Sequence, residues 1–218
     1  TDDALAKIVS SGVPDVIVNN ADVGTFGPIE LSDDASIDLT FETNLVAPLR
    51  IMRSLVPHIR ERGSGVIVNV SSGLGFASDV GQGLYAASKH AMEGMTESLR
   101  HEVSAFGVRV TLVQPGPYRT DMTAGPNRRL TGAASDPDSP YAARTARAEA
   151  LFERISARMG DPQDVADRIV DLLDEDSPRL RHPLGPSAKA RLAFRWLFPF
   201  SAWEFVVARL TGAPEQES

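Results

Sequence analysis

The sequence predicts an α/β protein with a doubly wound, mostly parallel sheet and a helical extension at its C-terminus. Three short runs rich in β-branched residues carry this prediction, at residues 13–19 (VPDVIVN), 65–70 (GVIVNV) and 108–113 (VRVTLV). Segments with helical periodicity separate them, and strands that alternate with helices favour parallel pairing through crossover helices. With 218 residues, 42% of them hydrophobic, the chain is long enough to bury a substantial core.

The first half of the chain alternates helix and strand. Residues 3–11 place apolar side chains at helical spacing, and the strand 13–19 follows after Gly12. A loop then extends to Pro28. Ser32, with two aspartates after it, predicts the start of a long helix that ends near residue 62, with a kink at Pro48.

The second half continues the pattern. The strand 65–70 precedes a helix over about residues 84–106, and the strand 108–113 ends at the sequence QPGP. Residues 117–145 are rich in Gly, Pro, Ser and Asp, and a connection of that length is typical of a lid or binding loop. We expect the lid to extend to about residue 160, because Asp161 and Pro162 predict the N-cap and first turn of the next helix.

Residues 188–218 form the predicted extension. Both tryptophans lie in it, together with Phe194, Phe198, Phe200 and Phe205. Charged residues interrupt the apolar pattern, so we expect no membrane span, and Pro199 predicts a break between two amphipathic helices. We expect these helices to pack on the protein's own substrate entrance or on a partner subunit, in preference to a membrane surface.

Composition excludes several classes of function. A net charge of −7 without a cluster of Lys or Arg argues against a nucleic-acid partner. There is no cysteine, which excludes disulfides and thiolate metal sites and is compatible with the cytoplasm, where we expect the protein. No metal-ligand spacing occurs among the four histidines, which are His58, His90, His101 and His182.

Three residues in the middle of the chain point to chemistry. Tyr85 and Lys89 are four residues apart on the predicted helix, so they share one face, one turn apart. An ammonium group beside a phenol lowers its pKa from the usual value of about 10. Ser72 follows the strand 65–70, at the sheet edge where ligands bind. Together these groups can transfer a proton to or from a carbonyl or alcohol oxygen, although a Tyr-x-x-x-Lys pair taken alone also arises by chance.

Further motifs, in the same order, resemble those of the short-chain dehydrogenase/reductase family. Asn19-Asn20-Ala21 resembles the family's Asn-Asn-Ala-Gly turn, and Asn44 matches its active-site asparagine. The remaining matches are Ser72, Tyr85 and Lys89 at the family spacing, Pro115-Gly116 with Thr120, and Gly160-Asp161-Pro162. The resemblance extends from Thr1 to about Gly185.

The resemblance implies a Rossmann-like catalytic domain over residues 1–187 that uses NAD or NADP. Tyr85 would be the general acid/base, and Lys89 would lower its pKa and hold the cofactor ribose. Ser72 would orient the substrate oxygen, and Asn44 would hold a water that relays protons to Lys89; a structural role is an equal alternative for this asparagine. The implied cofactor-lining residues are Asn20, Ala21, Asp22, Val70, Tyr85, Lys89, Pro115, Gly116, Tyr118 and Thr120.

The sequence departs from the family pattern in two places that matter. It has no glycine-rich turn for the pyrophosphate, and its start corresponds to the end of the family's third strand. We therefore expect a longer parent protein and no turnover from these 218 residues alone. Asp22 stands where the family has Gly, which predicts either weaker cofactor binding or a carboxylate turned outward. Tyr118, where Val or Ile is usual, is a smaller change.

The predicted function is an NAD(P)-dependent oxidoreductase that interconverts a carbonyl and an alcohol. The aromatic extension and the long loop suggest a small apolar substrate. Helices at 32–62 and 84–106 resemble the family's dimer-forming pair, which implies a homodimer or homotetramer. Asp22 and the missing glycine turn motivate the alternative, a cofactor-poor relative that acts as a binding or interaction module.

Overall fold

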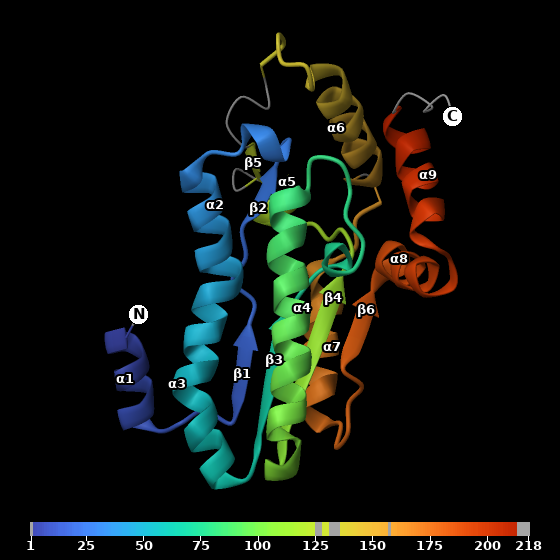
Figure 1. Cartoon of the computed structure of the whole chain (residues 1–218). Coiled ribbons are helices and arrows are strands. Elements are labelled where there is room, and N and C mark those ends of the chain that lie inside the picture. Colours follow the sequence, from blue (N-terminus) through green and yellow to red (C-terminus); the bar gives the residue numbers. More distant parts are fainter. Residues whose placement is uncertain (1, 125–127, 131–135, 157, 213–218) are drawn as a thin grey trace.

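The centre of the fold is a parallel sheet. The structure is a computed structural model that describes residues 2–124, 128–130, 136–156 and 158–212. Within these residues the main sheet has the order β1-β3-β4-β6, and Figure 1 shows the strands with long helices packed along them. The strands are β1 (Val16–Asn19), β3 (Gly65–Val70), β4 (Val108–Pro115) and β6 (Arg181–Leu184). The predicted doubly wound, mostly parallel α/β fold is confirmed.

Two helices cover one face of this sheet, α3 (Ala47–Arg62) and α4 (Gly83–Val103). They present apolar side chains at helical spacing, as an amphipathic helix against a sheet does. These side chains and those of the strands form one core, made of Ile17, Met52, Leu55, Ile59, Ile67, Val103, Val108 and Val110.

Helix α7 (Pro162–Asp174) supplies the other layer. Its Leu172 packs in a second core with Val66, Val68 and Val113. Because successive side chains of a strand point to opposite faces, Val66 and Val68 enter this core while the residue between them enters the first. β3 is therefore buried on both faces, as expected for a strand inside a parallel sheet.

The segment predicted as a loop, 20–28, contains a short strand. β2 (Gly24–Phe26) pairs in parallel with β5 (Arg128–Leu130), and a 3-10 turn, η1 (Ile29–Leu31), follows it. Three residues are too few for a periodic pattern, and the partner strand lies far along the chain. The loop prediction is wrong for these residues because the strand is made by tertiary pairing rather than by local preference.

The predicted long helix is interrupted before the proline that was expected to kink it. It consists of α2 (Asp34–Phe41), a π-helical turn η2 (Glu42–Val46) and α3. The N-cap is Asp33 rather than Ser32, since its carboxylate accepts the backbone N–H of Ser36 at 2.6 Å. Pro48 lies directly after the π turn, near the start of α3. The π turn contains Asn44, the residue whose carbonyl a proline at position 48 disturbs, so the helix is irregular beside the proline that predicted a kink.

Strand β6 is absent from the sequence prediction, because RHPL shows neither alternation nor a β-branched run. Polar contacts hold it against α4. Arg181 donates through Nε to the buried carboxylate of Glu93 at 2.9 Å and through Nη2 to Glu97 at 2.6 Å. Glu93 also accepts from Gln114 Nε2 at 2.9 Å, so one carboxylate connects α4, β4 and β6.

The predicted lid contains helices as well as loop. It includes α5 (Asp121–Ala124), β5 and α6 (Ala142–Ser156), while residues 125–127, 131–135 and 157 lie outside the described part. Asp161 caps α7 as predicted, because its carboxylate accepts the N–H of Gln163 at 3.0 Å.

The C-terminal helices are α8 (Gly185–Leu197) and α9 (Phe200–Thr211), and the predicted break at Pro199 is confirmed, since this residue is the N-cap of α9. Among the residues that the structure describes, no helix combines the length and the apolar character that crossing a bilayer requires.

Replacing Leu172 with alanine is expected to lower the free energy of unfolding by about 2–5 kcal/mol, because it leaves a cavity between α7 and the sheet. The matched control is Val170→Ala on the same helix, whose side chain is 58% exposed and whose change should stay within about 0.5 kcal/mol. Urea unfolding followed by circular dichroism measures both. Equal losses in the two variants would contradict the packing described for this face.

Candidate active site

The residues predicted for the site come from strand ends at one edge of the sheet. β1, β3 and β4 are parallel, and the segments after Asn19, Val70 and Pro115 all leave that edge. Helix α4 begins at the same edge, with Tyr85 in its first turn (Figure 1). This is the position where parallel α/β sheets bind ligands.

Lys89 is fully buried, and Tyr85, one turn before it, is 5% exposed. The Lys89 Nζ donates to the carbonyl oxygen of Val70 at 3.0 Å, at the end of β3. The same Nζ lies 5.6 Å from the centre of the Tyr85 ring. The predicted shared face of Tyr85 and Lys89 is thus present, and it is turned toward the sheet edge.

Asp22 directs its carboxylate at both of these residues. The Tyr85 hydroxyl donates to Asp22 Oδ2 at 2.8 Å, and the Lys89 ammonium lies 3.1 Å from the same oxygen. The other carboxylate oxygen, Oδ1, is buried and has no partner. Of the two outcomes expected for an acid in place of glycine, the outward-turned carboxylate is wrong, because the buried ammonium and the phenol attract it inward.

The electrostatics of the site follow from this contact. Burial raises the pKa of Asp22 from its usual value, in spite of the opposing effects of Lys89 and Tyr85. Burial also raises the pKa of Tyr85 well above its usual value, and the charge of Asp22 and its hydrogen bond raise it further. A hydrogen bond with Ser72 acts in the opposite direction.

In this arrangement the pKa of Tyr85 is raised by burial and by Asp22, and that Lys89 lowers it stays a prediction. The ammonium is paired with Asp22, so its positive charge is compensated by a carboxylate that itself touches the phenol. A phenolate formed here would face the negative charge of Asp22 at hydrogen-bond distance.

Asn44 lies on the π-helical turn η2 and is fully buried. Its Nδ2 donates to the carbonyl oxygen of Val23 at 3.0 Å, and its Oδ1 accepts the backbone N–H of Val23 at 2.9 Å. The Nδ2 also donates to the Ser88 hydroxyl at 3.1 Å. Asn44 therefore clamps the turn that carries Asp22, and these contacts are those of a structural asparagine.

The other residues of the predicted cofactor set line the same edge with mixed exposure. Asn20 and Ala21 are exposed. The backbone N–H of Gly116 is bonded to the Leu184 carbonyl at 2.9 Å. Tyr118 forms a parallel bridge to Gly160, where any side chain would collide with the Tyr118 ring. Thr120 is exposed, with its hydroxyl 3.2 Å from that of Thr123.

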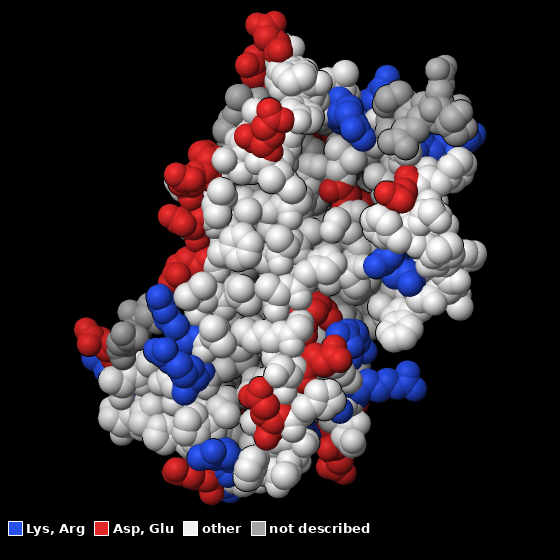
Figure 2. Space-filling model, viewed as in Figure 1, with Lys and Arg blue, Asp and Glu red and all other residues white. Residues whose placement is uncertain are grey.

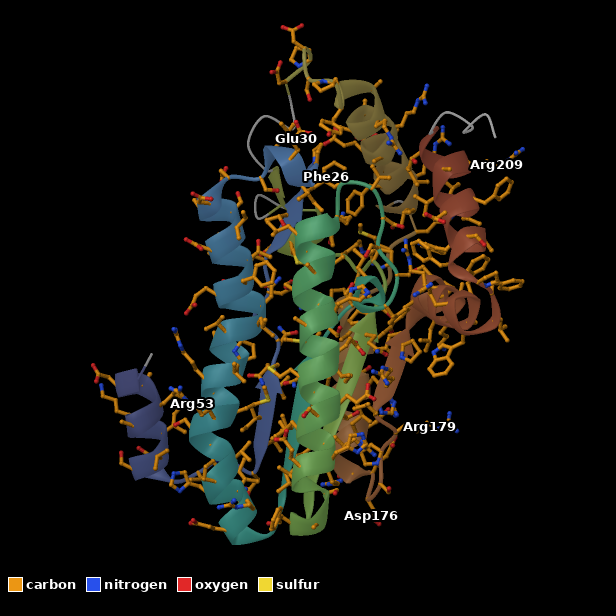
Figure 3. All side chains as sticks on the ribbon, in the orientation of Figure 1. Phe26, Glu30, Arg53, Asp176, Arg179 and Arg209 are labelled. Atoms are coloured by element: carbon orange, nitrogen blue, oxygen red, sulfur yellow. The ribbon has the colours of Figure 1, made fainter. Side chains whose placement is uncertain are left out.

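A pocket of about 320 Å³ opens beside the start of α4. It lies between the end of β2, the loop before α4 and helix α6, and Figure 3 shows Phe26 and Glu30 at this end of the molecule. Its wall is mainly backbone and apolar side chain, with Glu30, Asp79 and Arg144 as charged members. In the described residues no group of three His, Cys, Asp or Glu side chains could hold a metal ion.

Sequence reasoning missed two features of this site, the inward direction of Asp22 and the clamp of Asn44 on Val23. A signal for the first was available. A lysine on the inner face of a helix needs a counter-charge when it is buried, and Asp22 is the acid nearest to the end of β1.

Comparison with known proteins decides the family. Residues 2–130 match the family model of the short chain dehydrogenases. The chain belongs to the short-chain dehydrogenase/reductase family. It is 35% identical to the uncharacterized oxidoreductase YusZ of Bacillus subtilis over 208 residues, which cover 94% of this chain and 74% of the relative. Oxidoreductase chemistry is thus the chemistry of its relatives.

This short-chain dehydrogenase is also similar to a second curated protein and to a solved structure. It is 36% identical to retinol dehydrogenase 8 of Bos taurus over 176 residues, which are 79% of this chain and 56% of that protein. The crystal structure of a short-chain dehydrogenase from Streptomyces avermitilis matches it with a TM-score of 0.78 and 33% identity, over 97% of this chain and 73% of that one. The chain therefore spans between about half and three quarters of the length of these relatives.

Replacing Asp22 with asparagine is expected to lower the pKa of Tyr85, because it removes the negative charge that opposes the phenolate. The matched control is Asp164→Asn, which should lower the pKa of Tyr118, also raised by a nearby carboxylate, and leave Tyr85 unchanged. NMR of protein with 13C-labelled tyrosine resolves the three rings during titration. An unchanged Tyr85 titration in Asp22→Asn would show that Asp22 is not in contact with the phenol.

Proposed function

We propose that this short-chain dehydrogenase is part of an NAD(P)-dependent oxidoreductase that interconverts a carbonyl and an alcohol on an apolar substrate. One observation carries the proposal: the Tyr85 hydroxyl and the Lys89 ammonium converge on a single oxygen atom, at 2.8 and 3.1 Å, at the sheet edge where Ser72 also lies. Both donors can bind a hydroxyl of the cofactor ribose, and the Tyr85 hydroxyl can also donate to the reacting oxygen of a substrate.

The residues fit a nicotinamide nucleotide in their donor chemistry. The oxygen between Tyr85 and Lys89 is at present Asp22 Oδ2, and a ribose hydroxyl is an oxygen of similar size that both groups can bind. Asp22 must rotate away for this to happen. Asn20, Ala21, Val70, Pro115, Gly116, Tyr118 and Thr120 are proposed to line the cofactor, which when bound supplies the hydride.

The proposed proton chemistry uses three side chains. Ser72 donates a hydrogen bond to the substrate oxygen and orients it. In the direction of reduction Tyr85 gives its proton to that oxygen as negative charge develops there, and in oxidation the phenolate takes the proton back. Lys89, released from Asp22, stabilises the phenolate. Asn44 acts as a positioning residue for the turn 20–23, and the water that relays protons from it to Lys89 stays a prediction.

An apolar substrate is supported by the pocket beside α4, whose wall is largely backbone and apolar side chain. The name of one relative, retinol dehydrogenase 8, gives an apolar alcohol as that protein's substrate. The lid at 117–160 is proposed to close over this pocket, because α6 forms one of its walls. The residues 1–187 then act as the catalytic domain.

We also propose that the protein assembles as a homodimer or homotetramer through the outer face of α2, α3 and α4. Exposed large apolar side chains lie on two of these helices, Ile37 on α2 and Leu49 on α3. The proposed setting is the cytoplasm, since a chain without cysteine needs no oxidising compartment.

One observation favours a second candidate, a cofactor-poor relative that acts as a binding module. The Asp22 carboxylate occupies the oxygen position that a ribose would need, and its charge repels a polyanion. Titration of the full-length protein with NADH and NADPH, followed by nicotinamide fluorescence, separates the two functions. Micromolar or tighter binding excludes the second candidate.

Replacing Tyr85 with phenylalanine in the full-length protein is expected to reduce turnover of carbonyl substrates by about 100-fold or more, because the proton donor is lost. Cofactor affinity should change far less, since Lys89 remains. Steady-state assays with NADH and NADPH against a panel of ketones and aldehydes measure the first, and fluorescence titration measures the second. Turnover at the wild-type rate would refute the proposed mechanism.

Replacing Asp22 with glycine is expected to tighten NAD(P)H binding by about tenfold, because it removes an internal competitor and a negative charge. Asp22→Asn serves as the control, since it removes the charge but keeps the bulk, and it should give a smaller gain. Fluorescence titration of the full-length variants measures both. Weaker binding by Asp22→Gly than by the wild type would mean that Asp22 helps to hold the cofactor.

A further inference from the structure

We propose that the outer face of α8 and α9 docks on the surface of an anionic lipid bilayer. The face presents a continuous apolar run at the junction of the two helices. Trp196 and Leu197 are 78% and 75% exposed. The other exposed large apolar side chains of this segment are Phe198, Phe200, Phe205 and Leu210. Six of the thirteen large apolar side chains that are exposed in the described residues lie in α8, in α9 or between them.

The inner face of the same helices packs on the loop before α4. Arg191 Nη1 donates to Asp79 Oδ1 at 2.9 Å, and Trp203 Nε1 donates to the Ser78 carbonyl at 3.1 Å. Phe194 packs on both Phe198 and Trp203, with ring centres 4.7 and 5.6 Å apart. The two helices are thus fixed to the loop before α4, and the exposed face is what remains after the protein's own packing is complete.

Charge indicates the partner. The two helices carry four basic residues and one acidic residue, in a chain whose net charge is −7. Arg191 is paired with Asp79 and Arg195 donates to the Phe76 carbonyl, whereas Lys189 and Arg209 are exposed. Figure 2 shows blue side chains beside the white surface on this side of the molecule, and Figure 3 shows Arg209 pointing outward from α9. An apolar face bordered by cations is complementary to anionic headgroups.

A second copy of the chain is a poorer occupant of this face. In a two-fold symmetric contact the same patch meets itself, so two patches that each have four basic residues and one acidic residue would bring an excess of positive charge together. A lipid surface instead accepts the aromatic side chains at headgroup depth and offers negative charge to Lys189 and Arg209.

The attachment of α8 places the proposed lipid-binding face near the candidate active site. Arg195 Nε donates to the Phe76 carbonyl at 3.1 Å, so α8 is held to the loop that joins Ser72 to Tyr85. That loop also forms part of the wall of the pocket beside α4. Docking through α8 and α9 would therefore hold this end of the molecule close to the lipid. The docking itself does not depend on the proposed chemistry.

The test uses the two tryptophans, Trp196 on the outer face and Trp203 on the inner face, as separate probes. In the full-length Trp203→Phe variant, Trp196 is the reporter in this part of the chain. Its emission should shift to shorter wavelength, and brominated lipid should quench it, when vesicles of equal parts phosphatidylcholine and phosphatidylglycerol are added. In the reciprocal Trp196→Phe variant the emission of Trp203, bonded to Ser78, should stay unchanged.

Co-sedimentation with the same vesicles gives a second measurement that does not alter the inner face. Leu197→Ser combined with Phe205→Ser should weaken vesicle binding by about tenfold or more, whereas Val170→Ser, at an exposed position on α7, should leave it unchanged. Circular dichroism checks the fold of each variant. Vesicles of phosphatidylcholine alone should bind much less protein, and added salt should weaken binding to the anionic vesicles.

Three results would overturn the proposal. One is the absence of wild-type binding to anionic vesicles, and another is equal binding to neutral ones. The third is a shift of Trp196 emission that follows protein concentration without lipid, together with a dimer in sedimentation that Leu197→Ser dissociates. In that last case the face is an interface between copies of the chain.

Discussion

The buried ammonium of Lys89 is the constraint around which the active-site edge is built. A lysine without solvent contact keeps its charge only if its donors are satisfied and a negative group lies close to it. The end of β3 supplies a carbonyl oxygen, and the turn after β1 supplies the Asp22 carboxylate. Asn44, on the π-helical turn, then holds the turn after β1 through its side-chain oxygen and nitrogen, which both bond the backbone of Val23. The Lys89 ammonium thereby fixes the relative positions of helix α4, of two strand ends and of the long helix.

The helices and strands with a regular hydrophobic pattern along the chain were predictable from the sequence. The buried strands are short β-branched runs, and Tyr85 and Lys89 are one helical turn apart, so periodicity alone places them on one face. Parallel topology then brings the ends of β1, β3 and β4 to the same edge. The resemblance to one family suggested a role for Ser72. In the structure the side chain of Ser72 forms a hydrogen bond with Tyr85.

What the sequence could not provide depends on pairing between distant residues. β2 is three residues long and exists because β5 lies beside it, and β6 is held by an arginine that reaches carboxylates on α4. The irregularity of the long helix is a π turn, which periodicity along the chain does not reveal. The direction of Asp22 is of the same kind. A carboxylate on the turn after β1 can face solvent or the sheet edge, and the position of Lys89, far along the chain, decides between the two directions.

Asp22 also changes how the tyrosine has to be understood. With the carboxylate in place, Lys89 forms an ion pair with Asp22, and the pKa of Tyr85 is raised by burial and by the neighbouring carboxylate. A neutral hydroxyl at the same oxygen position would leave the ammonium without its carboxylate, and its field would then favour the phenolate. The acid/base strength of Tyr85 therefore depends on which oxygen lies between it and Lys89. In the proposed mechanism, Asp22 therefore couples the activation of Tyr85 to the departure of its own side chain from the oxygen position beside Lys89.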